Sequence, residues 1–278
     1  DLDFNAFLAK TSTDFSYMTY MEYGNYFILF NTITKERVEL GQFSDALCWA
    51  NSSNMLLHDN YVTNNNQDFF QWVLRNAETG DTEVFIEYTL DFFEEVYVRS
   101  AAFSKDDQSL LLLISDNFSA GPTNLWEMNI ETKNLIKVID FESKGVQITQ
   151  TFSLAPDGNM MHFQGWNESE KSNGIYQYSF NTNTLNKITD SFDLDFEPVI
   201  SPDNQKIAFL SRRTQTNEIW VYDIQSEKYL QVTGGFNQQY DKGNSTYIRW
   251  LNNSELVTAM VERTEAESRD RLVKLQLN

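Results

Sequence analysis

The stretch that decides the fold is DLDFNAFLAKTSTDFSYMTYMEYGNYFILFNTITKERVELG, from Asp1 to Gly41, because it returns as DLDFEPVISPDNQKIAFLSRRTQTNEIWVYDIQSEKYLQVTG, from Asp193 to Gly234. Both copies begin with Asp-Leu-Asp-Phe. Each then gives an apolar strand, a polar turn, an apolar strand, a loop, an aromatic strand, a turn and a final strand. Such an order is typical of an antiparallel unit of four strands.

The same order recurs in the rest of the chain. Its clearest marker is the third strand, where aromatic and β-branched residues alternate as in half-buried strands. The copies of this strand are 26–30, 70–74, 125–128, 175–178, 219–222 and 272–275. Repeats of this size indicate a propeller, in which each blade has two apolar faces that stack on its neighbours. Most aromatic residues should therefore pack between blades.

We predict one all-β domain over residues 1–278: a six-bladed β-propeller of four-stranded antiparallel blades. The approximate repeats are 1–43, 44–93, 94–145, 146–192, 193–239 and 240–278. The sixth repeat supplies strands only at 247–250, 256–261 and 272–277. Either the last blade has three strands, or the first residues of the chain complete it and the first blade is short. The match between the stretches at Asp1 and Asp193 favours a three-stranded last blade.

The amino-acid composition limits the kinds of partner that the chain can bind. The chain has 278 residues, 41% of them hydrophobic, and a formal net charge of −19. This charge repels phosphate backbones and disfavours nucleic acid. No apolar run is long enough to span a membrane. The sole cysteine, Cys48, lies in an apolar strand, and with only His58 and His162 a Cys/His metal cluster is excluded. The first residues lack the features of a signal peptide, so we interpret Asp1 as the start of a mature or trimmed chain.

One segment resembles a known repeat. Residues 198–209 (PVISPDNQKIAF), 217–223 (NEIWVYD) and 230–233 (LQVT) resemble the TolB-like repeat, also called the WD40-like or PD40 propeller repeat. The fourth repeat is similar more loosely, at 155–158 and 188–189. This resemblance implies a six-bladed propeller, usually bacterial and outside the cytoplasm, with the periplasm as the expected location. It implies structural roles for the motif residues and transfers no catalytic residue.

Similar propellers also form the sensory ends of membrane-anchored transcription regulators and the non-catalytic caps of oligopeptidases. The resemblance therefore implies a sensory or docking domain of a larger envelope protein. It leaves the identity of the partner and the oligomeric state open.

Strand order predicts which face could bind a partner. In an up-and-down blade, the second-to-third loops and the interblade loops emerge on the same side, and function concentrates on variable loops. The predicted long loops are 59–67, 115–123, 165–173 and 262–270 within blades, and 90–95, 141–147, 191–195 and 234–245 between blades. Exposed aromatic residues among acids suit a protein or peptide partner. The predicted anchors are Tyr61, Phe92, Phe93, Glu94, Glu95, Phe118, Trp166, Phe236 and Tyr240.

Signals for catalysis are weak. The chain has no Gly-x-Ser-x-Gly motif, and both histidines fall near second strands, where a packed side chain is expected. Acid pairs at 94–95 and at 193 and 195 could serve acid–base chemistry, so a carboxylate-dependent glycan-active enzyme around the central channel is the alternative function. These acids, with 106–107, could also bind Ca²⁺, although no loop has EF-hand spacing. A domain that only spaces its neighbours is a third reading. We predict no catalytic residue, no metal and no cofactor.

Overall fold

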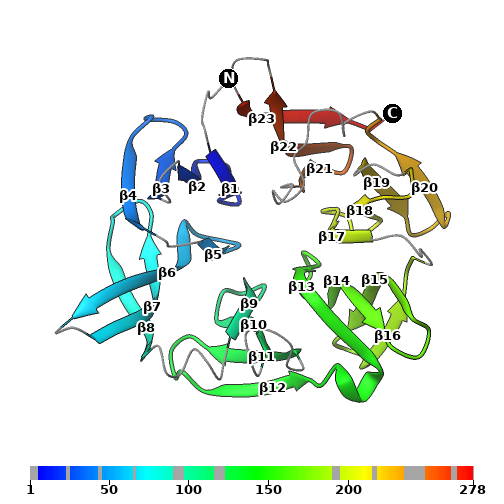
Figure 1. Cartoon of the computed structure of the whole chain (residues 1–278), viewed down its shortest axis with the longest axis horizontal. Helices are drawn as coiled ribbons and strands as arrows, with labels where there is room; N and C mark the ends of the chain where they lie inside the picture. Colours follow the sequence, from blue (N-terminus) through cyan, green and yellow to red (C-terminus); the bar gives the residue numbers. More distant parts are fainter. Residues whose placement is uncertain are drawn as a thin grey trace. The chain divides into compact units, whose positions relative to one another are not determined.

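The computed structural model of the chain describes residues 6–22, 26–42, 46–64, 67–89, 97–115, 123–189, 195–214, 218–234, 248–263 and 268–277. Nearly all of these residues form antiparallel β-strands or the turns between them (Figure 1). Among them, the only helical segment is a single 3₁₀ turn, η1 (Glu142–Lys144). None of the helical structure in the described part of the chain could cross a membrane.

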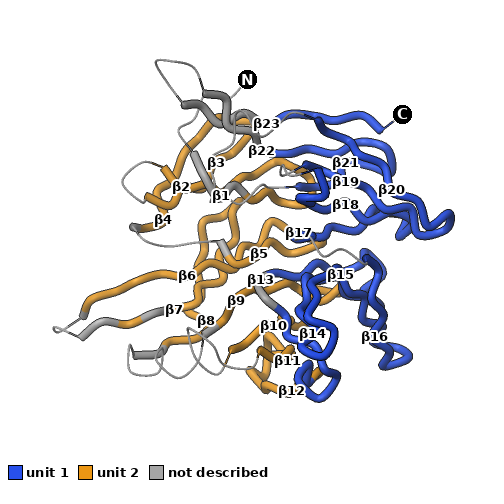
Figure 2. The backbone as a smooth tube through the Cα atoms, turned by 45° about the vertical axis from the view of Figure 1, so that its right-hand side comes forward, with its two compact units in different colours: residues 1–3, 140–278 blue, residues 4–139 orange. Residues whose placement is uncertain are grey.

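The chain divides into two compact units (Figure 2). The N-terminal unit is residues 4–139, and the C-terminal unit is residues 140–278 with residues 1–3. Each unit holds three antiparallel sheets, and each sheet is made from one continuous segment of the chain. Five sheets have four strands and the last has three. This confirms the predicted all-β, six-bladed propeller and its three-stranded last blade, and the sheets are called blades 1 to 6 in chain order.

Blades 1 to 3 form the N-terminal unit, and each is a meander of four strands. Their strands are β1 (Ala6–Thr11), β2 (Tyr17–Glu22), β3 (Tyr26–Asn31) and β4 (Arg37–Gln42); β5 (Ala46–Trp49), β6 (Met55–Asn64), β7 (Gln67–Asn76) and β8 (Thr82–Thr89); and β9 (Tyr97–Phe103), β10 (Ser109–Ser115), β11 (Thr123–Asn129) and β12 (Leu135–Ile139).

Blades 4 to 6 form the C-terminal unit. Their strands are β13 (Val146–Leu154), β14 (Met160–Asn167), β15 (Ser172–Ser179) and β16 (Thr184–Lys187); β17 (Asp195–Ile200), β18 (Lys206–Ser211), β19 (Glu218–Asp223) and β20 (Lys228–Gln231); and β21 (Ile248–Asn252), β22 (Glu255–Arg263) and β23 (Ser268–Gln276). The third strands of all six repeats thus fall on β3, β7, β11, β15, β19 and β23, as the alternating pattern predicted.

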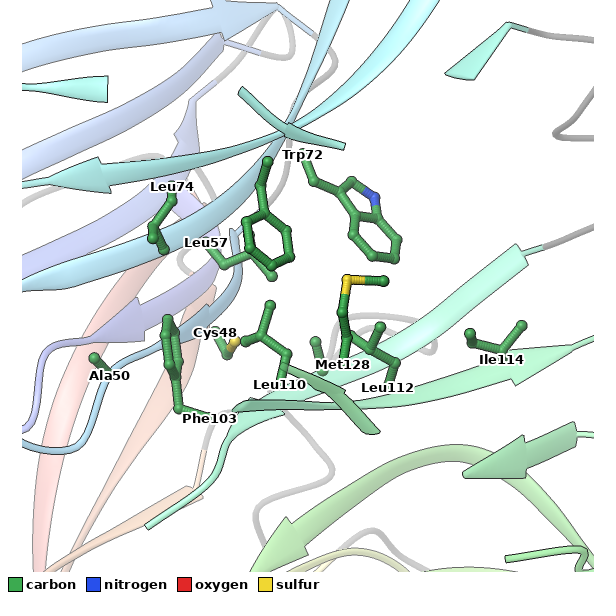
Figure 3. Packing of buried hydrophobic residues seen from close by; sticks show 12 residues of the cluster. Cys48, Ala50, Leu57, Trp72, Leu74, Phe103, Leu110, Leu112, Ile114 and Met128 are labelled. Atoms are coloured by element: carbon green, nitrogen blue, oxygen red, sulfur yellow. The ribbon is translucent and has the colours of Figure 1, made fainter. Parts of the chain in front are cut away.

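The core of the N-terminal unit lies between neighbouring blades. Figure 3 shows one such cluster, in which side chains of blade 2, including Leu57 and Trp72, face side chains of blade 3, including Leu110, Leu112 and Met128. Leu57, Leu110 and Leu112 have no solvent exposure. Burying each such side chain contributes about 1.5–3 kcal/mol. The aromatic residue of the third strand in blade 2 therefore fills the space between blades.

Blade 5 shows why its strands are apolar on both faces. On β18, Ile207 and Phe209 pack with Ile200 of the same blade against Ile175 of blade 4. The intervening residue Ala208 belongs to the cluster that blade 5 forms with blade 6. Successive strand residues point to opposite faces, so a blade buried on both sides reads as a continuous apolar run.

Blades 5 and 6 are also joined by a polar contact. The indole Nε1 of Trp250, which is buried in blade 6, donates a hydrogen bond to the carbonyl oxygen of Val199 in blade 5 at 3.0 Å. This bond satisfies the indole N–H that packing between the two blades removes from water. The Trp250 side chain therefore packs in the apolar cluster and also fixes the position of one sheet against the other.

The Ser-x-Asp turn of the repeat has a clear physical role. In blade 5, Ser201 Oγ donates to Asp203 Oδ1 at 2.6 Å. The backbone N–H of Gln205 donates to the same carboxylate oxygen, and that of Lys206 donates to Ser201 Oγ at 2.8 Å. Two side chains thus satisfy the turn between the first two strands. The same set of bonds recurs at Ser12 and Asp14 and at Ser104 and Asp106.

In blades 4 and 5, the hydroxyl of a threonine just after the fourth strand accepts a backbone hydrogen bond from the third strand. Thr189 Oγ1 accepts the N–H of Ile175 at 3.0 Å, and Thr233 Oγ1 accepts the N–H of Ile219 at 2.8 Å. Both threonines are almost fully buried. These residues end the Ile-Thr and Val-Thr pairs of the repeat, so their hydroxyls occupy equivalent structural positions.

Three of the predicted long loops are largely strand. The ladder of β6 and β7 continues to the pair Asn64–Gln67, so most of 59–67 is a hairpin. The segments 165–173 and 262–270 are likewise mainly strand, in β14–β15 and β22–β23. The prediction of open loops was wrong there because polar residues in these hairpins continue the backbone ladder. Of the predicted loop 115–123, residues 116–122 lie outside the described residues.

Candidate functional site

Of the nine predicted anchors, the structure describes Tyr61 and Trp166. Both lie near the end of a hairpin between the second and third strands of a blade. Tyr61 is on β6 in the N-terminal unit, and Trp166 is on β14 in the C-terminal unit. The remaining anchors, Phe92, Phe93, Glu94, Glu95, Phe118, Phe236 and Tyr240, lie outside the described residues.

Tyr61 is a surface residue on a rigid element. It is 38% exposed and stands opposite Phe70 of β7 in a ladder of ten paired residues. An exposed aromatic side chain held by a long antiparallel ladder offers a large contact area with little conformational entropy to lose on binding.

Trp166 is half-buried, and its polar atom has a partner. Its indole Nε1 donates to Glu168 Oε2 at 2.7 Å. Glu168 also forms an ion pair with Lys171 across the turn. Hydrogen bonds from Lys171 and from Trp166 hold the pKa of the Glu168 carboxyl below its ordinary value. The end of the β14–β15 hairpin therefore carries an oriented indole beside an ionised carboxylate.

Sequence reasoning missed a cluster of charged groups at one end of blade 5. The carboxylate of Asp195, at the start of β17, is fully buried. It accepts a hydrogen bond from Ser211 Oγ at 2.5 Å and an ion pair from Arg213 Nη2 at 2.8 Å. Arg213 Nε also donates to Ser211 Oγ at 3.2 Å. Asp195 and Ser211 are register partners on β17 and β18, which brings residues distant in sequence together.

Arg213 is also surrounded by aromatic rings. Its guanidinium carbon lies 4.0 Å from the ring centroid of Tyr229, 5.2 Å from that of Phe209 and 5.3 Å from that of Trp220. The planar guanidinium can stack on such rings while its N–H groups bind the carboxylate. Arg213 is therefore fixed in place by three side chains and one ion pair.

Glu218 is a second buried acid at the same end of blade 5, with 1% exposure. Its Oε2 accepts a hydrogen bond from Thr233 Oγ1 at 2.7 Å. Buried acids with internal partners usually serve to organise the structure, because an unpaired buried charge would cost several kcal/mol. Both Asp195 and Glu218 are bonded inside the blade and withdrawn from solvent.

The acids at 106–107, which the sequence offered as Ca²⁺ ligands, have structural partners. The hydroxyl of Ser104 and the N–H of Gln108 hold the pKa of Asp106 below its ordinary value. Asp107 accepts the backbone N–H groups of Asn51 and Ser52, both at 2.9 Å, and so joins the turns of blades 2 and 3. Within the described part of the chain, no three His, Cys, Asp or Glu residues come together as metal ligands.

The two histidines are packed inside blades. His58 Nδ1 contacts the carbonyl oxygen of Asp59 at 2.8 Å, while neither ring nitrogen of His162 has a hydrogen-bond partner among the described residues. Burial lowers the pKa of each to about 4. Burial likewise raises the pKa of the Cys48 thiol to about 12, so the thiolate is inaccessible near neutral pH. These groups are poorly suited to act as bases or nucleophiles.

Comparisons with known proteins identify the fold. Neither a protein-family model nor a curated protein sequence matches the chain. Among solved structures, TolB from Acinetobacter baumannii aligns over 98% of this chain and 63% of its own, with a TM-score of 0.65 and 16% identity. The chain thus spans less than two thirds of that TolB.

The fold of the chain is therefore similar to that of the TolB β-propeller. Two further structures have the same architecture. An oligogalacturonate lyase in complex with manganese aligns over 99% of this chain and 77% of its own, with a TM-score of 0.65 and 13% identity. The oligogalacturonate lyase from Vibrio parahaemolyticus aligns over 99% and 78%, with a TM-score of 0.65 and 12% identity. Identities this low establish the TolB-like propeller fold and leave the activity to be argued from the site.

Proposed function

We propose that this TolB-like propeller is a non-catalytic domain that binds a protein or peptide partner through the side of its blades where second and third strands meet. It acts outside the cytoplasm, in the bacterial periplasm, as the sensory or docking part of a larger envelope protein. A membrane-anchored transcription regulator is one such parent. The resemblance of its repeat to the TolB-like family supports the location.

One observation carries this proposal: the β6–β7 and β14–β15 hairpins hold Tyr61 and Trp166 on paired strands, with the former exposed and the latter half-buried. Aromatic side chains on rigid elements are favoured anchors in protein interfaces. The charged groups Asp195 and Arg213 on blade 5 are already bonded to each other, which suits a scaffold.

The test is site-specific photocrosslinking in the bacterial envelope. A benzoylphenylalanine residue at position 61 or 166 should trap one partner, which is then purified. Tyr61→Ala or Trp166→Ala should weaken its affinity for the whole chain by about tenfold or more, as expected for interface anchors.

A matched position provides the control. Ile33 is 75% exposed and lies in the β3–β4 turn, at the opposite end of its blade's strands from the β2–β3 connection. A crosslinker there should trap nothing. The binding face would be refuted if the crosslinker at position 33 gave as much adduct as those at positions 61 and 166. It would also be refuted if neither Tyr61→Ala nor Trp166→Ala changed the affinity of the trapped partner.

The fold is similar to that of oligogalacturonate lyases, so a carboxylate-dependent enzyme that acts on glycans is the second candidate function. The acids at the end of blade 5 argue against it, because Asp195 and Glu218 are buried and hydrogen-bonded inside the blade. A glycan could not reach either carboxylate without breaking these bonds. We expect no unsaturated uronate product when the chain is incubated with oligogalacturonate and Mn²⁺. Formation of that product, measured by ultraviolet absorbance, would favour the enzyme.

A further inference from the structure

Blade 6 ends in a long and regular edge strand. β23 has 9 residues, and its pairing with β22 runs from end to end without a register shift. The fourth strands, which form the corresponding edges of the other blades, have only 4 to 8 residues. In the described part of the chain, no strand pairs with the side of β23 that faces away from β22. Long, flat edges of this kind are templates for pairing with another extended segment.

One hydrogen bond aligns β23 with the third strands of the other blades. The N–H of Leu277, the first residue after β23, donates to the carbonyl oxygen of Ser254, the last residue before β22, at 2.8 Å. The first residue after the third strand makes the same bond in every other blade. These donors are Thr32, Ala77, Ile130, Phe180 and Ile224. Residues of β23 can therefore be matched one by one to residues of the other third strands.

The fourth strands share a bulge at one point of this alignment. Five residues before the donor, the third strand faces two residues of the fourth strand instead of one, as the register shifts and paired hydrogen bonds show. The first of the two is apolar in all five blades, and it is buried or half-buried: Leu40, Phe85, Val138, Ile188 and Val232. All but Val138 pack in the apolar clusters between blades. The position in β23 that corresponds to the bulge is Leu272.

The backbone of β23 is set to bind a strand at this place. Alternate residues of an antiparallel strand direct their N–H and C=O groups to the same neighbour. Because Leu277 bonds toward β22, Leu272 and Lys274 direct these groups away from it. In blade 4 the counterpart of Leu272 is Ile175, whose carbonyl oxygen accepts the N–H of Ile188 in the bulge at 2.8 Å. In blade 6 no strand within the described ranges takes up the equivalent groups.

Charge and sequence decide between the possible occupants of this edge. The sequence of β23 holds three basic residues and one acid, so its formal charge is three minus one, in a chain of −19. Two copies of this strand side by side would bring like charges together, which destabilises a sheet. Residues 1–4 repeat residues 193–196, which run into β17, so the repeat assigns them to blade 1. A neutral or acidic segment of another protein meets neither objection.

We propose that the open edge of β23 is a docking site for an extended, neutral or acidic segment of a protein partner, which adds as the fourth strand of blade 6. The segment runs antiparallel to β23, as all five fourth strands run to their third strands. It carries an apolar residue and then threonine opposite Leu272, as in blades 4 and 5. Backbone hydrogen bonds supply affinity, and the apolar residue sets the register. This site goes beyond the proposed function, because it uses neither Tyr61 nor Trp166.

The probe is a fluorescent peptide with the sequence of the fourth strand of blade 5, SEKYLQVTG, residues 226–234. Its fluorescence anisotropy, titrated with the whole chain, should show saturable binding. The peptide with Val232→Asp should bind about tenfold more weakly or worse, because it loses the buried apolar side chain. The peptide with Leu230→Pro should not bind, since Leu230 is the register partner of Val221, the counterpart of Lys274, and proline removes its N–H. Equal binding of the three peptides would refute strand addition.

Two substitutions in β23 test the edge itself. Lys274→Pro removes one N–H that faces away from β22, a position where an edge strand tolerates proline. It should abolish peptide binding, whereas the matched control, Lys274→Ala, keeps the N–H and should bind as the unmodified chain does. If both variants bind alike, the edge of β23 is not the site.

A crosslink locates the peptide even if Lys274→Pro fails to fold. With benzoylphenylalanine in place of Tyr229, the peptide should form an adduct that mass spectrometry maps to residues 268–276. An adduct within residues 218–223 would mean that the peptide replaces β20 in blade 5, and it would overturn the proposal.

Two further variants separate this site from the alternatives. Deletion of residues 1–5 should leave the affinity for the peptide unchanged. Binding only after that deletion would assign the edge to the chain's own first residues and overturn the proposal. Tyr61→Ala should also bind the peptide normally. Loss of binding in that variant would place the peptide on the face that contains Tyr61 and refute a separate edge site.

Discussion

Single residues show how the strands tolerate ionisable groups in their interior. Asp195 is paired with Arg213, and the turn carboxylates such as that of Asp203 accept hydrogen bonds. The two histidines are instead neutral at ordinary pH, because burial lowers the pKa of each imidazole. Removing one partner of a buried ion pair costs about 3–5 kcal/mol.

We predict that His162 makes the chain sensitive to acid. Its pKa falls from the ordinary 6.5 to about 4 in the folded chain because of burial. Between these values the unfolded chain binds a proton that the folded chain does not, so stability falls as pH falls from 6.5 to 4 and is unaffected above this window. The loss is on the order of 3 kcal/mol.

The measurement is urea unfolding at about pH 7 and about pH 4.5, comparing the unmodified chain with His162→Leu. The variant keeps an apolar side chain and cannot be protonated. All other titrating groups, His58 included, are common to both proteins, so the difference between their pH slopes isolates His162. Identical slopes would show that the imidazole is not held neutral by burial.

At the scale of the element, β14 and β15 approach each other through a glycine pair. Gly165 and Gly174 are register partners. A Cβ atom at Gly165 would lie 2.6 Å from Val146 Cγ1 and 2.8 Å from Tyr176 Cδ2. The tyrosine ring stacks on Phe163, with centroids 5.8 Å apart, and so has little room to move. These strands need glycine because an aromatic ring covers the position.

We predict that Gly165→Ala destabilises the chain by about 1–3 kcal/mol, because the new methyl group overpacks blade 4. The matched control is Gly234→Ala, where the nearest atom to a Cβ is Gln231 Nε2 at 3.8 Å. Urea unfolding should show a lower midpoint for the first variant and an unchanged midpoint for the second. Equal midpoints would mean that the Tyr176 ring can move aside.

The elements that the sequence predicted are those whose pattern is local. The third strands were found because buried aromatic and β-branched residues alternate along each of them. Residues 59–64 were predicted as part of a loop because polar residues flank the adjacent Tyr61 and Val62 on both sides, and only the pairing with β7 makes them a strand. The alternation of apolar and polar residues reflects which strand residues are buried, so it gives little signal for hairpins that project into solvent.

The site was less predictable than the fold for a similar reason. Tyr61 and Trp166 could be proposed from residue type and position in the repeat. The contact between Asp195 and Arg213 depends on the register of β17 and β18, which no single-sequence pattern specifies. Asp195 was therefore considered as a catalytic acid, although the structure makes it the partner of an arginine.

At the scale of the whole molecule, the net charge of −19 opposes folding through the mutual repulsion of acidic groups. We predict that NaCl raises the melting temperature near neutral pH, because the screening length shrinks to about 10 Å at 0.1 M. A thermal scan checks this, and the salt effect should vanish near the sequence pI of about 4.4. A melting temperature that falls with salt would mean that ion pairs such as Lys133–Glu83 outweigh the net repulsion.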